Sequence, residues 1–257
     1  MKPRGWAALA CVLGLAVCSC ATPRVPDHAI SQKDWTLVRG RLAALRATQA
    51  VRPYVAQLRV GMREPRSGKT FEGRGALAVH PHSAMRMILV GPGGTTALDV
   101  WITRDRWKFA IPPADFRRSG GTDPASSRGL PIAFFRWWFL APLDGRLLSA
   151  GVGRLGPTYL LRDGTGTVIL HDQNESSGRH LVAVRRDAGA VPPLGGQRSA
   201  VQALEWAGKD FTPHAGDHAR YVEDVTGLQV EVQVEEVSNE EPDPAAFLDP
   251  DEPGVSL

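Results

Sequence analysis

Between Tyr54 and Glu235, apolar and polar residues alternate with a period of two, and turn residues interrupt the alternation about every eight to twelve positions. The alternation is cleanest over 228–235, where Leu and Val alternate with Gln and Glu. Because successive side chains of a strand point to opposite faces, this pattern predicts antiparallel strands with one covered face. We expect strands over 54–63, 70–80, 84–90, 95–103, 106–111, 158–162, 167–171, 180–185, 200–211, 219–223 and 228–235.

One segment breaks the alternation. Residues 130–143 are apolar on all sides except at Arg136, and they contain Pro131 and Pro142 close to the two ends. The length suits about three helical turns, and a helix without a polar face must be buried. Residues 117–128 before it are rich in Gly, Ser and Arg, and we expect a mobile loop there.

These elements predict a mainly β fold with α: a strongly curved antiparallel sheet, forming a half-open, incomplete β-barrel, wrapped around a hydrophobic helix. One short helix cannot fill the concave face of so long a sheet, so we expect an apolar cavity. An ordinary sandwich core is the alternative, because it gives the same periodicity. The expected cavity residues are Met85, Met87, Leu89, Phe134, Trp137, Trp138, Val230 and Val232.

An amphipathic helix should precede the sheet. Ser31 can cap it, and apolar residues recur at helical spacing until the pattern ends near Pro53. The apolar positions are Trp35, Val38, Leu42 and Leu45.

The N-terminus has the features of a bacterial lipoprotein signal. Lys2 and Arg4 precede an apolar run, and Ser19-Cys20 places a small residue before a cysteine that can carry acyl chains. Cys20 fits better than Cys18, because bulky Val17 would sit just before Cys18. An ordinary secretory signal with chance cysteines is the alternative. We expect the signal peptide over 1–19 and a lipid-anchored tether over 20–30.

Charge is unevenly distributed. The formal charge of +3 falls to +1 when Lys2 and Arg4 are removed, and the eleven carboxylates of 221–257 leave +12 on residues 20–220. A solvated surface explains this, and so does association with an anionic membrane. The export signal argues against a nucleic-acid partner. Residues 239–257, acidic and rich in proline, should form an extended tail that the folded domain, 31–238, does not need.

Two stretches resemble the LolA/LolB-like superfamily of periplasmic lipoprotein carriers and outer-membrane lipoprotein receptors. The first runs from Gly73-Arg74-Gly75-Ala76 into the strand 85–90 and Gly91-Pro92-Gly93-Gly94; the second is the segment 130–142. The ending at 244–247 is similar to the family's closing turn. The resemblance implies a half-barrel that binds lipid or the acyl moiety of a lipoprotein, and a periplasmic carrier protein as a partner.

The sequence departs from the receptor branch of this family in two places. Trp206 is the only late tryptophan, and Thr95 and Thr96 stand where a protruding loop would carry an exposed leucine. Delivery of cargo by that loop is therefore not implied.

No catalytic motif is present, so we expect no enzyme, no cofactor and no metal. The pairs His80 with His82 and His214 with His218 are expected to be surface imidazoles in turns, and Asp99 an outward-facing strand residue. We expect a lipoprotein of the outer membrane, facing the periplasm, anchored at Cys20 and binding lipid in its cavity. A non-catalytic envelope scaffold with a plugged core is the main alternative.

Overall fold

The computed structural model describes residues 30–65, 68–91, 93–123, 126–127, 129–141, 143–154, 156–163, 166–175, 178–187, 201–208, 211–224 and 226–251. The predicted signal peptide and Cys20 lie outside these residues. Within the described part of the chain, no helix is long and apolar enough to cross a membrane.

Thirteen strands form one antiparallel sheet in the order β6-β5-β4-β3-β2-β1-β13-β12-β11-β10-β9-β8-β7. The sheet is not closed: β6 and β7 are its two edges. The strands are β1 (Tyr54–Glu64), β2 (Lys69–His80), β3 (Ala84–Val90), β4 (Thr96–Thr103), β5 (Trp107–Ile111), β6 (Phe116–Gly120), β7 (Arg146–Gly153), β8 (Gly156–Arg162), β9 (Gly166–Glu175), β10 (Gly178–Asp187), β11 (Val201–Gly208), β12 (His218–Glu223) and β13 (Gln229–Ser238).

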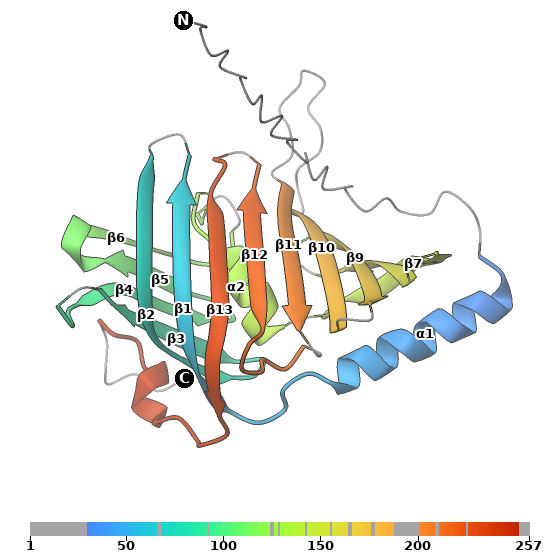
Figure 1. The fold of residues 1–257 in the computed structure, drawn as a ribbon, viewed down its shortest axis with the longest axis horizontal. Helices are drawn as coiled ribbons and strands as arrows, with labels where there is room; N and C mark the ends of the chain where they lie inside the picture. The colour runs from blue at the N-terminus through green and yellow to red at the C-terminus, as the bar shows by residue number, and fades with distance from the viewer. Residues whose placement is uncertain are drawn as a thin grey trace, which may run out of the picture.

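The hydrophobic helix lies behind the middle of the sheet, where β13 and β12 cross in front of it (Figure 1). It consists of α2 (Ile132–Phe135) and the π-helical turn η2 (Arg136–Leu140), and all of its residues except Ala133 and Arg136 are buried. The predicted fold class, a mainly β curved sheet around a hydrophobic helix, is therefore confirmed.

The first helix, α1 (Gln32–Ala47), begins as the sequence predicts. Ser31 is its N-cap, and the Ser31 hydroxyl accepts a hydrogen bond from the backbone N–H of Asp34. Val38, Leu42 and Leu45 are buried, whereas the helix ends at Ala47, earlier than predicted. Arg46 fixes this end, because its guanidinium donates to the carbonyls of residues 143 and 145 beside β7.

Two predictions about irregular segments are wrong. β6 occupies the beginning of the expected mobile loop over 117–128, where it pairs with β5. The expected extended tail, 239–257, packs against the sheet in its described part. A 3-10 helix, η3 (Pro244–Phe247), places Phe247 at 8% exposure beside β3, and the indole N–H of Trp101 donates to the Phe247 carbonyl at 2.8 Å.

Candidate functional site

The inner face of the sheet and the α2–η2 helix form one apolar cluster, which contains every predicted cavity residue. These side chains are between 0 and 7% exposed. Met85, Met87 and Leu89 come from β3, and Val230 and Val232 come from β13. The structure thus brings these residues together, and α2–η2 contributes Phe134, Trp137 and Trp138.

Aromatic rings fill the space between the helix and the strands β11 and β12. Phe134 stacks on Tyr221 with a centroid separation of 4.6 Å, and Trp138 meets Trp206 edge to face at 4.4 Å. Trp137 makes an edge contact with Phe211 at 6.5 Å. Such contacts stabilise a packed core in addition to the burial of apolar area.

The void beside these rings is small. It measures about 10 Å³, at the lower limit for a single water molecule. The expected apolar cavity is therefore not open at this position, because large aromatic side chains occupy it. Of the predicted cavity residues, only Phe134 and Trp137 line the void. Its other walls are Val168, Ala183, Arg185, Gln202, Ala203, Leu204 and Tyr221.

Arg136 is the polar exception in this helix, and it ties the helix to the β4–β5 turn. Its Nε donates to the carbonyl of Thr103 at 3.2 Å. Burial lowers the pKa of the Arg136 guanidinium; Asp105 raises it in part, and the positive charge of Arg185 lowers it further. Arg136 is thus a partly desolvated cation near the interior.

The backbone around the helix is unusual at two points. Ala141 donates to the carbonyl of Arg136, five residues earlier, which defines the π turn. Leu143, a fully buried residue, has φ of 62°, a left-handed conformation that is costly for a branched side chain. π turns and strained residues occur often at functional sites, so both features favour a helix with a role beyond packing.

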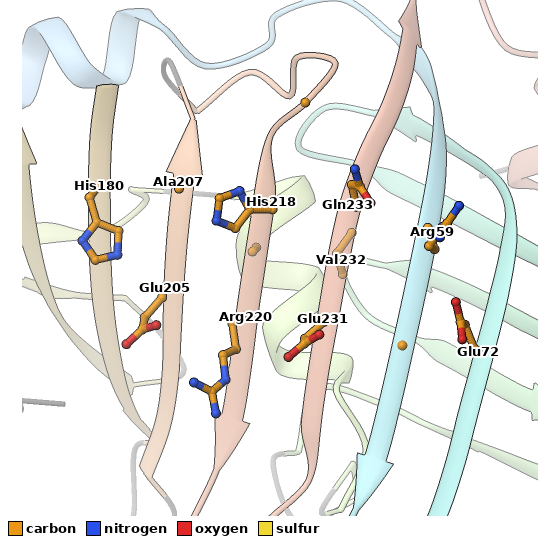
Figure 2. Close-up of a pocket in the computed structure, with 13 residues that line it drawn as sticks. Arg59, Glu72, His180, Glu205, Ala207, His218, Arg220, Glu231, Val232 and Gln233 are labelled. Carbon is orange, nitrogen blue, oxygen red and sulfur yellow. The ribbon is translucent and has the colours of Figure 1, made fainter. Parts of the chain in front are cut away.

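The outer face carries a hollow of about 690 Å³ that the sequence did not predict (Figure 2). Strand register forms two rows of side chains there. The first is His180, Ala207, His218, Gln233 and Arg59, and the second is Glu205, Arg220, Glu231, Gly61 and Glu72.

Each row contains one small residue, Ala207 in the first and Gly61 in the second, and its neighbours in the row are charged or polar. Alternation alone identifies outward positions such as Glu231 and Gln233, but only strand pairing shows which of them become neighbours. Charged side chains lie beside the apolar part of this lining, and an acyl chain there would remain open to water, so the hollow does not replace the interior as a lipid site.

The predicted surface histidines are only partly in turns, because His80 ends β2 and His218 begins β12, whereas His82 and His214 lie in turns. The Nδ1 of His80 is 2.7 Å from the hydroxyl of Ser83 in the β2–β3 turn, and His214 lies in the turn before β12. Asp99 faces outward and pairs with Arg86 at 2.9 Å. Among the described residues, no three His, Cys, Asp or Glu side chains are grouped as a metal ion would require.

Two solved structures share this architecture. A LolA superfamily protein from Nitrosomonas europaea matches with a TM-score of 0.53 and 8% sequence identity, over 82% of this chain and 97% of its own. A DUF1329 family protein from Desulfovibrio piger matches with a TM-score of 0.52 and 11% identity, over 82% of this chain and 96% of its own. No protein-family model and no curated protein matches the chain.

This chain therefore shares its fold, an open curved sheet around a buried helix, with these two proteins, and the resemblance seen in the sequence is confirmed for the fold alone.

Proposed function

We propose that this chain is a lipid-anchored envelope protein that binds a lipid, or the acyl moiety of a lipoprotein, between its curved sheet and the α2–η2 helix. The observation that carries this proposal is the largely apolar inner face, covered by a helix that has no polar face of its own. An acyl chain that replaced the helix would gain about 25 cal/mol for each Å² of apolar surface that it buries.

The small void means that a ligand enters only if the helix moves. The strained backbone at Leu143 stores some of the free energy that such a movement would release. We further propose that the anchor is Cys20 and that Ala21, in the place where aspartate favours inner-membrane retention, directs the protein to the outer membrane.

The filled interior specifically favours a second candidate, a scaffold lipoprotein whose core is permanently plugged. Phe134, Trp137 and Trp138 already make close aromatic contacts, and they leave room for about one water molecule. In that case the function would depend on the outer surface.

Tryptophan emission of the purified chain, titrated with a long-chain lipid, distinguishes the two candidates. If the helix moves, emission changes with saturation, and Trp137→Phe and Trp138→Phe variants assign the signal. Emission that stays constant in all variants would exclude lipid binding here. Trp138→Ala is the accompanying stability test. If Trp138 is a fixed part of the core, the free energy of unfolding should fall by about 3–5 kcal/mol. A smaller decrease would indicate that the neighbouring side chains can rearrange to fill the space.

A further inference from the structure

A row of buried polar side chains crosses the inner face of β10, β11 and β12. Arg185 is paired with Gln202, and Gln202 with Glu223, in the strand register. Their exposed fractions are 8, 9 and 4%, and they share the inner face with Ala183, Leu204 and Tyr221. Burying such groups in an apolar core costs stability unless they are paired, so the row calls for an explanation.

The two charged members of the row are compensated by neighbours. The guanidinium of Arg185 contacts the carboxylate of Asp163 at 2.9 Å, and the carboxylate of Glu223 accepts a hydrogen bond from the hydroxyl of Thr226. Arg136 is close enough to affect Arg185, and Asp105 is close enough to affect Arg136, so the surroundings hold two cations and three carboxylates. The two cations are therefore already balanced, and a further carboxylate brought into the region would bury an unbalanced negative charge.

The row also adjoins the place where a ligand would bind. Arg185 and Gln202 line the void beside Phe134 and Trp137. The indole N–H of Trp137 lies there without a hydrogen-bond partner among the described residues. The void thus has apolar walls from the helix and, at one end, groups that both donate and accept hydrogen bonds.

We propose, on the basis of the lipid-binding function above, that the interior selects an amphiphile with an uncharged, hydrogen-bonding head group, such as the hydroxyl and ester groups of an acylglycerol, and that Gln202 recognises this head. The apolar chain takes the place of Phe134 and Trp137. The head group reaches the row, where the Gln202 amide can donate to an ester carbonyl and accept from a hydroxyl.

The test compares two ligands with the same chain, 1-palmitoylglycerol and palmitate, by tryptophan emission of the purified protein at pH 8. We expect 1-palmitoylglycerol to bind at least about tenfold more tightly, because the carboxylate of palmitate loses its hydration without a balancing charge. Gln202→Met keeps the length of the side chain but removes its hydrogen bonds, so it should weaken the binding of 1-palmitoylglycerol and reduce this preference. Gln233→Met, on the outer face, is the matched control and should leave the preference unchanged.

The possible results distinguish a failure of this inference from a failure of the proposed lipid-binding function. If neither ligand binds, the lipid-binding function fails and the inference fails with it. If both bind equally, or palmitate binds more tightly, lipid binding stands and the neutral-head inference is overturned. A preference of undiminished size in a folded Gln202→Met variant removes Gln202 as the recognising residue, and the ligand comparison remains decisive even where that variant does not fold.

Discussion

Asp249 is 2% exposed in a segment rich in carboxylates and prolines. Its carboxylate accepts hydrogen bonds from Lys108 and from the backbone N–H of Asp251, and it lies 3.4 Å from Arg106. Arg106 and Lys108 also lie over the ring of Trp101, 5.6 and 6.0 Å from its centroid. Burial raises the pKa of Asp249, but the hydrogen bonds and nearby cations outweigh it, so the pKa lies below its ordinary value.

Because the folded-state pKa of Asp249 is lowered, its contribution to stability is complete above the ordinary carboxyl pKa and is lost as the pH falls through the lowered value. Asp249→Asn should reduce the free energy of unfolding at pH 7 by about 1.5–3 kcal/mol. It should also flatten the loss of stability below about pH 4. Urea unfolding between pH 2 and 7 measures both effects. Asp115→Asn is the control, because Asp115 is exposed and has a φ that asparagine accepts. If the wild type and both variants lose stability equally in acid, ionised Asp249 does not stabilise the fold.

Gly75, in the glycine-rich stretch of β2, has no room for a side chain. A Cβ at this position would collide with the carbonyl oxygen of Ile88 and lie 2.9 Å from the Cα of Leu89, both of them backbone atoms of β3. Gly75→Ala should therefore separate β2 from β3 and cost about 1–3 kcal/mol or more. Gly61→Ala, where a Cβ meets open space, should be close to neutral. Thermal unfolding of the two variants makes the comparison, and equal melting temperatures would rule out a packing role for Gly75.

At the scale of elements, the inner strands could be predicted and the two edge strands could not. An inner strand such as β13 buries one face, so Val230, Val232 and Val234 must recur with a period of two. β6 and β7 pair on one side only. The shift of register between Leu147 and Ser149 also breaks the alternation of β7. Their sequences therefore lack the signal that identifies the other strands.

The C-terminal segment was mispredicted because a short, proline-rich stretch has no periodicity that could reveal its contacts. Phe247 is 8% exposed, its ring lies 6.1 Å from that of His80, and its carbonyl binds Trp101. Ending the chain at Ser238 should therefore lower the melting temperature by about 10 °C, since losing one buried aromatic ring costs about 3–5 kcal/mol. Ending it at Asp251 keeps all these contacts and serves as the control. Equal melting temperatures would restore the prediction of a dispensable tail.

At the scale of the whole molecule, the sequence predicted which residues face the interior but not whether they leave space. Met85 and Val232 are inward positions by periodicity alone, as the structure confirms. Whether a cavity remains depends on contacts between distant residues, such as Trp138 with Trp206, which no local pattern contains. The polar row of Arg185, Gln202 and Glu223 was missed for the same reason.

The proposed attachment of the protein to a membrane depends on Cys20. This residue lies outside the described residues, so its lipidation stays a prediction. Cys20→Ala should release the protein from membrane fractions or leave it unprocessed, because two or more acyl chains are needed for stable attachment. Cell fractionation with immunodetection measures this, and Cys18→Ala is the matched control. A Cys20→Ala protein that matures and remains with membranes like the wild type would show that the lipoprotein prediction is wrong.

The topology makes the two halves of the chain depend on each other. The first half supplies β1 to β6 and the second supplies β7 to β13, and within the sheet they pair where β1 meets β13, as in the pair of Val60 with Val232. The helix between the halves packs on both, because η2 contacts β2 and β3 while Phe134 stacks on Tyr221 of β12. Neither half can therefore bury its inner face alone.

We accordingly expect one cooperative unfolding transition, in which damage to either half destabilises the whole. Leu58→Ala in β1 and Leu170→Ala in β9 remove fully buried side chains from opposite halves. Each should cost about 2–5 kcal/mol and lower the single melting temperature by about 2–4 °C for each kcal/mol. Calorimetry with tryptophan emission recorded in parallel tests this, since a single transition gives coincident curves. Two separate transitions, with each variant shifting only one of them, would mean that the halves fold as independent units and that the helix is attached to only one of them.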